Sequence, residues 1–484
     1  MSYHFRDPIH GMVAVNNCEE KIIKSKPFQR LRHIKQLGTT FLVYHGADHT
    51  RFGHSIGVMH LVSQALESLR KKEPLKYMGD EEYEKLKQTA RIAALLHDVG
   101  HAPFSHVGEN EEYKLFPQLK DVDGNPRAGH EAYTHLIIRD LLGKIIEKEC
   151  PHINIADVLG LLMRTVTDAR YYFICDLMDG QLDVDKMDYL LRDSHYCGVK
   201  YGSYDLGRMM DVICICPTKF GEWRLGIDSD GVHAVEEFIF ARYWMFLQVY
   251  FHKTRRIYDY FLSRFLQEEF NQYPKKINDF LNLSDPVIFE KIKNKSSQNP
   301  WAKCIYTRTH MKEIYVSTPH YEDDTDFDRV VRLIEGFKND FAKEISAGKC
   351  YVDQADTSSA KSLIKIRRFL DNDSSDYEEA QMPAIPVKDK HNEHTISPIQ
   401  EFSLPIRAMS DRKINQFRIY AERGLVAKAE RFVKRKRAAI EKEIGKENDQ
   451  KNIILKKENQ LVQEKAVFEA KMKLAQERIA KYKR

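Results

Sequence analysis

The sequence predicts a mainly α-helical protein, in which a helical bundle is followed by a small α+β C-terminal lobe and a charged helical tail. Two observations support this class. Apolar residues recur at helical spacing through most of the first 270 residues, and the apolar run 91–96 ends abruptly in the polar pair His97-Asp98. At 484 residues the chain is long for one core, so we expect three regions. These are a core over 1–270, a mixed lobe over 271–423 with an exposed linker near 371–398, and a basic tail over 424–484.

The helices of the core follow from local signals. Pro27 suits the first turn of a short helix. Apolar residues three and four apart predict further helices beginning near His54 and Val184. Residues 238–268 are rich in aromatic side chains and predict one long buried helix. A small hairpin is expected beside the bundle, over 212–216 and 223–227.

The pattern weakens beyond residue 270, where the expected helices are shorter and more charged. Residues 403–407 and 416–420 have the composition of strands in a small α+β lobe. In the tail, apolar residues stand seven apart at Ile454, Leu461 and Phe468. This spacing predicts a helix that forms a coiled coil.

The net charge of +5 hides an asymmetry. Residues 411–484 contain 22 lysines and arginines against 11 acidic residues, a net of +11, so the rest of the chain has a net of −6. The basic character therefore belongs to the tail. Nucleic acid is a candidate partner for the tail, although charged helices are more often solvated or coiled faces.

Several classes of protein do not fit the sequence. The first residues lack the apolar segment of a secretory signal. The longest aromatic and apolar run, 238–251, is too short to span a bilayer and contains Arg242, so we expect no membrane segment. The eight cysteines are scattered without a Cys-x-x-Cys motif. This pattern favours reduced thiols and a cytoplasmic location.

His97-Asp98 is the most informative pair in the chain. A carboxylate at the end of a buried run is costly unless a partner or a cation compensates its charge. Histidines also concentrate here, because 12 of the 20 lie within the first 135 residues. His54 and Asp185 complete a candidate set of two imidazoles and two carboxylates. Such a set suits one divalent transition metal, Fe, Mn, Co, Ni or Zn.

With these residues in view, the chain resembles the HD-domain dNTP triphosphohydrolases, in the branch typified by the sterile-alpha-motif/HD-domain enzymes. We expect no sterile-alpha-motif domain ahead of the core. The resemblance rests on an ordered series of motifs rather than on any one of them. They are Asp7-Pro-Ile-His-Gly, Phe28-Gln-Arg-Leu-Arg-His-Ile-Lys-Gln-Leu-Gly, Arg51-Phe-Gly-His, His97-Asp-Val-Gly-His-Ala-Pro-Phe-Ser-His, His130-Glu, Asp183-Val-Asp-Lys-Met-Asp-Tyr and Tyr250-Phe-His-Lys.

The resemblance implies an HD-domain core that cleaves a deoxynucleoside triphosphate (dNTP) to deoxynucleoside and inorganic triphosphate. It implies Mg²⁺ on the substrate phosphates and assembly into a homo-oligomer, a dimer or tetramer. The metal ligands would be His54, His97, Asp98 and Asp185. The catalytic group would be His101, His106, Glu109 and His130, with His130 or His106 as general acid. Substrate contacts would come from Gln36, Leu37, Arg51, Lys186, Tyr189, Asp193, Arg242, Tyr250, His252 and Lys253.

The chain departs from the resembled enzymes where those enzymes bind a nucleotide activator. Lys24 occupies the position of an acidic residue that reads guanine. Asp228 and Asp230 occupy positions where basic residues would bind the activator phosphates. Because a carboxylate repels a phosphate, we expect turnover without GTP or a response to a different effector.

Two other functions remain open at this point. One is an HD hydrolase of a different phosphoester, such as a nucleotide monophosphate, a cyclic dinucleotide or a nucleic-acid end. The other is a nucleic-acid-binding assembly protein in which the HD site serves regulation. The phosphate-containing product of the reaction distinguishes these functions.

Overall fold

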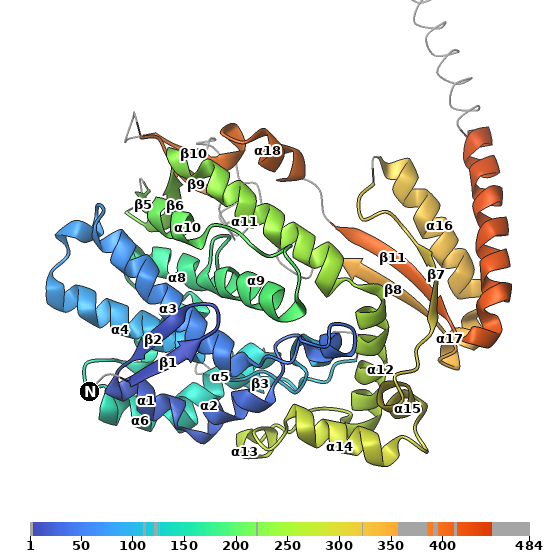
Figure 1. Cartoon of the computed structure of the whole chain (residues 1–484), viewed down its shortest axis with the longest axis horizontal. Helices are drawn as coiled ribbons and strands as arrows, with labels where there is room; N and C mark the ends of the chain where they lie inside the picture. Colours follow the sequence, from blue (N-terminus) through green and yellow to red (C-terminus); the bar gives the residue numbers. More distant parts are fainter. Residues whose placement is uncertain are drawn as a thin grey trace, which may run out of the picture. The chain divides into compact units, whose positions relative to one another are not determined.

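The computed structural model describes residues 3–109, 113–120, 124, 126–218, 221–321, 323–356, 385–390, 395–410 and 414–447. The protein is mainly α-helical with a few small sheets, as predicted (Figure 1). It divides into two compact units. The first unit comprises Met1–His310 and Asp356–Ile414, and the second comprises Met311–Ala355 and Asn415–Arg484.

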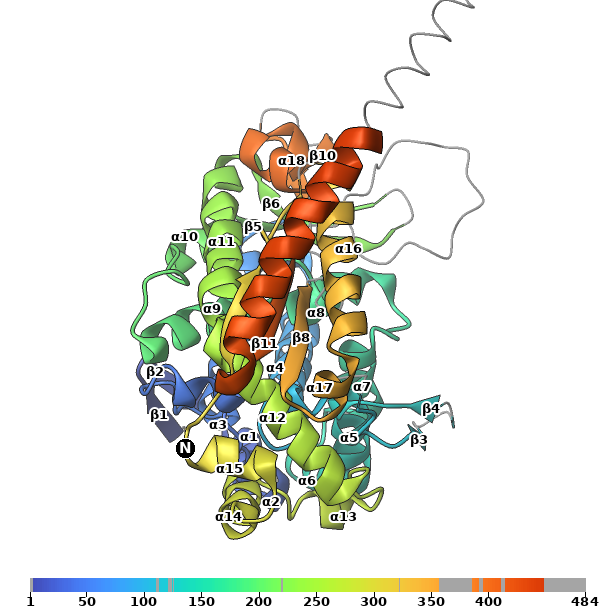
Figure 2. The ribbon, with the colours of Figure 1, turned by 90° about the vertical axis from the view of Figure 1, so that its right-hand side faces the viewer.

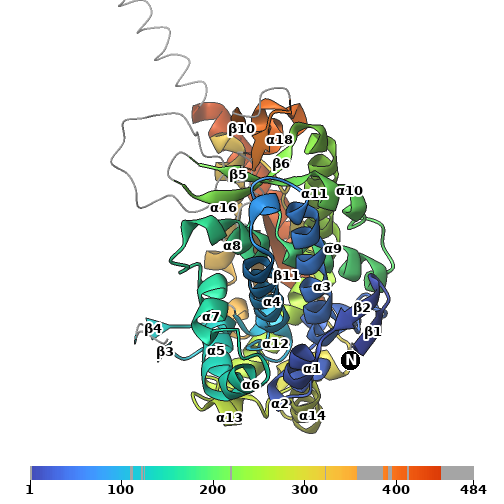
Figure 3. The same cartoon turned by 90° about the vertical axis from the view of Figure 1, so that its left-hand side faces the viewer.

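Three helices form the centre of the first unit: α3 (Arg51–Arg70), α4 (Asp80–Leu96) and α9 (Val184–Cys197). Helix α3 packs against both of the others, and α3 and α4 lie side by side in Figures 1 and 3. Helix α4 begins with three acidic residues, which favour the positive end of the helix dipole. Asp183 caps the N-terminus of helix α9, because its side chain accepts a hydrogen bond from the Lys186 amide.

The chain enters this bundle through the antiparallel hairpin of β1 (Tyr3–Asp7) and β2 (Gly11–Val15). Helices α1 (Asn17–Ile23) and α2 (Lys26–Arg30) follow, and α2 has its proline in the first turn as expected. The remaining helices before residue 213 pack around the centre. They are α5 (His130–Ile137), α6 (Gly143–Glu149), α7 (Ile155–Met163), α8 (Tyr172–Asp179) and α10 (Leu206–Val212), with the short strands β3 (Leu119–Lys120) and β4 (Pro126–Arg127).

The predicted hairpin is confirmed as β5 (Ile213–Pro217) paired with β6 (Trp223–Asp228). Two later strands extend this sheet: β9 (Pro386–Lys388) lies parallel to β6, and β10 (Ile396–Pro398) pairs with β9. The prediction of an exposed linker is therefore wrong for these two strands, because both pair into this sheet and Val387 of β9 is buried. Residues 371–384 and 391–394 lie outside the described residues.

The prediction of a strand over 403–407 is also wrong, because residues 404–410 form helix α18 (Leu404–Ser410). Ser403 and Pro405 explain the difference. The Ser403 hydroxyl accepts a hydrogen bond from the Ile406 amide at 3.1 Å, and proline is well suited to a first helical turn.

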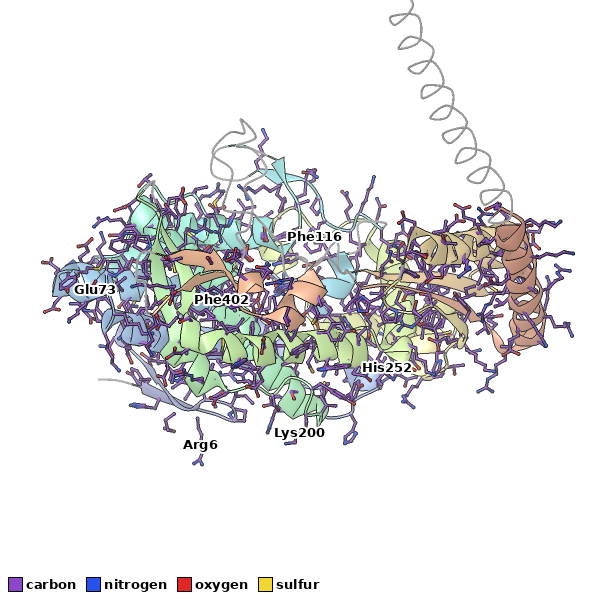
Figure 4. All side chains as sticks on the ribbon, turned by 90° about the horizontal axis from the view of Figure 1, so that it is seen from above. Arg6, Glu73, Phe116, Lys200, His252 and Phe402 are labelled. Atoms are coloured by element: carbon purple, nitrogen blue, oxygen red, sulfur yellow. A yellow bond between two sulfur atoms is a disulfide. The ribbon has the colours of Figure 1, made fainter. Side chains whose placement is uncertain are left out.

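The single helix predicted over 238–268 is instead two helices, α11 (Val232–Met245) and α12 (Lys253–Phe270). A π-helical turn over 246–250 ends the first of them. His252, labelled in Figure 4, begins the second, and its Nδ1 accepts a hydrogen bond from the Thr254 amide at 3.2 Å. Helix α12 then packs against α15 (Pro300–Tyr306), which is preceded by α13 (Ile277–Phe280) and α14 (Asp285–Lys295).

The second unit contains a three-stranded sheet with β11 (Asn415–Ala421) between β7 (Lys312–Val316) and β8 (Cys350–Asp356). Strands β8 and β11 lie side by side in Figure 2. Strand β11 confirms the strand predicted at 416–420. The helical elements of this unit are α16 (Asp324–Asp340), α17 (Ala342–Ser346) and a helix over 426–447. Phe432, Ile440 and Ile444 of that last helix join the hydrophobic core of the unit. The seven-residue spacing at 454, 461 and 468 lies outside the described residues.

Two findings concern the predictions about membrane segments and cysteines. Among the described residues, no helix is long and apolar enough to cross a membrane. A disulfide joins Cys18 to Cys150, whose Cα atoms lie 5.6 Å apart. The prediction that all thiols are reduced is therefore wrong for this pair, because the fold brings together two cysteines that are 132 residues apart in the sequence. The other six cysteines, all among the described residues, do not take part in disulfides.

Candidate metal centre and active site

The four candidate ligands come together from three elements. His54 lies in the first turn of α3, His97 and Asp98 directly follow α4, and Asp185 lies in the first turn of α9. The His54 Nε2 atom is 2.9 Å from an Asp185 oxygen and 3.5 Å from an Asp98 oxygen. The His97 Nε2 atom is 3.3 Å from Asp98 and 3.7 Å from Asp185. We call these four residues the metal cluster.

The outer nitrogens of the two imidazoles are already occupied. His54 Nδ1 pairs with Asp188 Oδ2 at 2.8 Å, and His97 Nδ1 pairs with the Ala94 carbonyl at 2.7 Å. Both Nε2 atoms are buried and, among the described residues, have no hydrogen bond of good geometry. Metal-bound histidines are held in this way, with the outer nitrogen bonded to the protein and the inner one directed at the cation. The residues present therefore fit a transition metal.

The pKa shifts in the metal cluster also indicate a site for positive charge. Burial acts to lower the pKa of His54, but the neighbouring carboxylates of Asp185 and Asp188 raise it to about 10. Although burial acts to raise the pKa of Asp185, its contacts with His54 and His97 hold that pKa well below the usual range. The site thus favours positive charge beside ionised carboxylates. The Asp185 side chain is 34% exposed, so the cluster is accessible to solvent.

Asp188 is the most heavily bonded carboxylate near the metal cluster. Besides His54, it pairs with His10 Nε2 at 2.6 Å and accepts two hydrogen bonds from Arg192, each at 2.8 Å. Arg192 also donates to Asp7 at 2.9 Å. A Cβ atom at Gly57 would lie 2.0 Å from Asp188 Oδ1, so only glycine lets α3 approach α9 this closely.

The predicted catalytic residues form a second group, the histidine cluster, around Glu109. His106 Nδ1 hydrogen-bonds to Glu109 Oε2 at 2.7 Å, and His130 Nδ1 lies 2.7 Å from Oε1. The His101 and His130 rings stack with centroids 3.8 Å apart. His101 Nε2 lies 3.2 Å from Asp98 Oδ1. The histidine cluster therefore contacts the metal cluster through His101 and Asp98.

Protonation differs within the histidine cluster. Burial and the charges of Arg51 and His130 lower the pKa of His101 to about 3. Burial also acts to lower the pKa of His130, but Glu109 raises it overall. The nearby His130 and His106 hold the pKa of Glu109 well below its usual range, despite its burial. The cluster thus favours a neutral His101, an ionised Glu109 and a proton on His130.

The predicted phosphate-binding cations lie in different settings. Arg51 is buried and pairs with Asp98 Oδ2. Lys186 is buried and contacts Asp183 and the Gly180 carbonyl, the latter at 3.0 Å. Arg242 is buried in α11 over the Phe246 ring, and Lys253 is exposed at the start of α12. The structure thus brings Arg51 directly to the metal cluster, through its ion pair with Asp98.

The predicted sugar and base contacts form a third group. It includes His49, which was not among the predicted site residues. Asp193 accepts a hydrogen bond from the Tyr250 hydroxyl at 2.8 Å and pairs with His49 Nε2 at 2.8 Å. Tyr189 meets Tyr250 edge to face. The His49 carbonyl accepts from the amide of Gln36, whose buried side-chain oxygen has no partner among the described residues. Leu37 is also buried, and the His252 ring lies 5.8 Å from that of Tyr44.

The positions that differ from the activator-binding enzymes are all paired. Lys24 forms an ion pair with Glu20 in α1. Asp228 lies 3.0 Å from Lys72 Nζ, and Asp230 pairs with Lys390. These lysines offset the two carboxylates, so the repulsion of a phosphate at this place is smaller than the sequence alone indicates.

His10, His49, Asp188 and Arg192 were not among the predicted site residues. A signal existed for two of them, because Asp188 and Arg192 follow Asp185 by three and seven residues and so lie on neighbouring turns of one helix. His10 belongs to the quoted Asp7-Pro-Ile-His-Gly motif. Only the fold shows that His10 and Asp188 meet, since 178 residues separate them.

Comparisons with known proteins agree with this geometry. An HD domain matches residues 51–174, and an HD associated region matches residues 214–434. The uncharacterized protein YwfO of Bacillus subtilis is 37% identical over 265 residues, which is 54% of each protein. Human deoxynucleoside triphosphate triphosphohydrolase SAMHD1 is 29% identical over 273 residues, or 52% of this chain and 42% of SAMHD1. The chain spans about half the length of the curated relatives it matches.

Solved structures extend the likeness over most of the chain. A hypothetical protein from Aquifex aeolicus superposes with a TM-score of 0.68 at 28% identity, covering 90% of this chain and all of that one. A phosphohydrolase from Bacteroides thetaiotaomicron has a TM-score of 0.63 at 24% identity, covering 87% of this chain and all of the other, and shows the shared fold. The chain therefore resembles HD-domain proteins, with a match to an HD domain followed by a match to an HD associated region.

Proposed function

We propose that the chain is a metal-dependent phosphohydrolase that cleaves dNTPs to a deoxynucleoside and inorganic triphosphate. The observation that carries this proposal is the contact between the two clusters, in which His101 of the histidine cluster lies 3.2 Å from Asp98 of the metal cluster. The proposed metal site would then lie next to the proposed proton donors. Relatives named as dNTP triphosphohydrolases, at about 30% identity, support the choice of substrate.

The metal would be held by His54 Nε2, His97 Nε2, Asp98 and Asp185. When bound, it supplies Lewis acidity toward a phosphoryl oxygen or a lowered pKa for water. Fe, Mn, Co, Ni and Zn all accept this donor set. Asp188 and the Ala94 carbonyl orient the two imidazoles by binding their outer nitrogens.

In the proposed reaction, water attacks the α-phosphorus and the bond from phosphorus to the 5′-oxygen breaks. The leaving 5′-oxygen receives a proton, and the oxygen of the attacking water stays in the triphosphate. His106 and His130 are the two candidate proton donors, because each contacts a different oxygen of Glu109. Arg51, Lys186, Arg242 and Lys253 would hold the triphosphate with its Mg²⁺, and their positive charges would offset the charge that develops during attack.

The deoxynucleoside would be bound by the third group. Asp193, held by Tyr250 and His49, offers a carboxylate to a sugar hydroxyl. The buried Gln36 oxygen is an acceptor that still lacks a donor among the described residues. Tyr189 and Leu37 would supply apolar contacts to the sugar, and His252 would close over the base and phosphate.

The test is to load the protein with each candidate metal and to incubate it with single dNTPs and with the matching ribonucleotides. We expect triphosphate and deoxynucleoside in equal amounts from the dNTPs. A monophosphate or orthophosphate product would instead favour an HD hydrolase of another phosphoester. Binding of nucleic acid without turnover would favour the assembly protein with a regulatory HD site.

Regulation is part of the same assay. Because Lys24, Asp228 and Asp230 replace activator-binding residues, we expect single dNTPs to be hydrolysed without GTP. Light scattering would follow the expected homo-oligomer with and without GTP. A strict GTP requirement with GTP-driven assembly would show that these three positions do not correspond to an activator site.

A further inference from the structure

The loop that carries His101 and His106 is strained. We define the catalytic loop as residues 101–107. Two adjacent residues in it, Phe104 (φ 59°) and Ser105 (φ 56°), adopt the left-handed conformation without being glycine. Such a conformation is unfavourable for a residue with a side chain, and it persists only where the surroundings hold it. The contacts that hold this loop therefore matter for the placement of both histidines.

One of these contacts comes from a residue far outside the HD motifs. Asp285, the first residue of α14, has only 4% of its surface exposed. Its Oδ1 accepts a hydrogen bond from the strained Phe104 amide at 2.7 Å. Its Oδ2 accepts from the Lys35 amide at 2.8 Å. One carboxylate thus joins the catalytic loop to the segment that contains Gln36.

Further hydrogen bonds join the same three segments. Arg30 donates to the His101 carbonyl and to the Leu283 carbonyl, each at 2.8 Å. The Ser105 hydroxyl donates to the Lys35 carbonyl at 2.6 Å and accepts from Arg51 at 2.8 Å. The start of α14 therefore holds the catalytic loop at two places. Asp285 contacts the loop directly, and Leu283 contacts it through Arg30.

The chemistry of the side chain explains why an aspartate stands here. A carboxylate accepts hydrogen bonds on both of its oxygens, whereas an asparagine has only one acceptor oxygen. This advantage has a cost, because burial raises the pKa of Asp285 to about 6, although the amides of Lys35 and Phe104 oppose the shift. A charged group kept at a site that disfavours charge is typical of a role in function.

We propose that Asp285 is a positioning residue that, with Arg30, fixes the catalytic loop against the Lys35–Gln36 segment. The role rests on the proposed function, because it concerns the placement of His101 and His106 relative to the substrate. Asp285 itself contacts neither the metal cluster nor the histidine cluster through its side chain in the contacts observed here.

The test compares Asp285→Asn with a matched control, Asp176→Asn. Asp176 is equally buried and accepts hydrogen bonds from Arg164, Arg224 and the Leu225 amide, none of which belongs to the catalytic loop. We expect Asp285→Asn to lower kcat for dNTP hydrolysis by about 10- to 100-fold with little change in KM or metal content, because small misplacements of reacting groups are costly. Asp176→Asn should retain the wild-type kcat per folded molecule.

Hydrogen exchange provides a readout that does not depend on activity. In Asp285→Asn, peptides covering 101–107 and 34–37 should exchange faster than in the wild type, while those of α3 should not. An unchanged kcat, or unchanged exchange in the loop, would overturn the proposal. If the wild type hydrolyses no dNTP, the proposed function fails, and the exchange result alone still decides whether Asp285 holds the loop.

Arg30→Lys serves as a second variant should Asp285→Asn not fold. It keeps the positive charge but loses the forked contact between Leu283 and His101. It should lower kcat and speed loop exchange in the same direction. Wild-type values for both quantities would count against the proposal.

Discussion

Replacing Asp188 by asparagine should weaken metal binding without removing a ligand. In the wild type, Asp188 Oδ2 bonds to His54 Nδ1 while Oδ1 bonds to His10 Nε2. An asparagine has one acceptor oxygen, so its amide nitrogen must face one of these imidazoles. When the nitrogen faces His54, that imidazole loses the acceptor that fixes its tautomer, and its Nε2 is no longer held toward the metal.

The expected size follows from the role of such outer contacts. Mutation of a partner that holds a metal-bound histidine typically costs 10–100-fold in affinity, which corresponds to about 1.4–2.7 kcal/mol. The loss of stability should be smaller than for a fully unpaired buried charge, about 3–5 kcal/mol. Arg192 keeps one carboxylate partner, since it also donates to Asp7 at 2.9 Å.

The assay is a titration of metal-free protein with Mn²⁺ or Co²⁺ in a chelator buffer, with metal content measured by mass spectrometry. Asp176→Asn is the control, because it alters a buried carboxylate that bonds to two arginines and to no histidine in the observed contacts. A folded Asp188→Asn protein with wild-type metal affinity would refute the reasoning that Asp188 fixes His54.

Three further predictions follow from the site and from the tail. Glu109→Gln should lower the pKa of His130, whose proton the carboxylate stabilises, so activity that needs protonated His130 should be lost at lower pH than in the wild type; a pH–rate profile checks this. In the folded protein the pKa of Asp285 is about 6, against a usual 3.8, so the folded state binds protons more tightly than the unfolded state. The wild-type free energy of unfolding should therefore fall as the pH rises from about 4 to about 6. The fall should be at most about 3 kcal/mol and absent from Asp285→Asn, as urea unfolding at pH 5 and 7.5 would show. Ending the chain after Glu447 should spare dNTP hydrolysis and reduce any salt-sensitive binding of nucleic acid, whereas a cut before Phe432 should unfold the second unit because it removes core residues.

The metal cluster could be predicted because its signals are local. His97-Asp98 ends a buried apolar run, and Asp185 opens a helix with clear apolar spacing. Each residue was recognisable from its neighbours in the sequence. Their partners were not, since Asp188 meets His10 across a sequence separation of 178. The contact of Asp285 with Phe104 was equally hidden, because it spans a separation of 181.

The errors in the predicted fold also have physical reasons. The linker prediction overlooked β9 and β10 because three-residue strands are too short to show an alternating pattern, and β9 is stabilised by pairing with β6 far away in the sequence. The predicted helix over 238–268 contains no proline or glycine, so its interruption at His252 could not be read from composition. The interruption depends on a π-helical turn and a side-chain cap.

The most direct test of the central claim is hydrolysis of a single dNTP in water enriched in ¹⁸O, with the metal-loaded wild type and with Asp98→Ala. Attack on the α-phosphorus with departure of the 5′-oxygen predicts one ¹⁸O atom in the inorganic triphosphate and none in the deoxynucleoside. Asp98→Ala, which removes a metal ligand, should yield no product. Label in the deoxynucleoside, a monophosphate as product, or full activity of Asp98→Ala would contradict the proposed reaction.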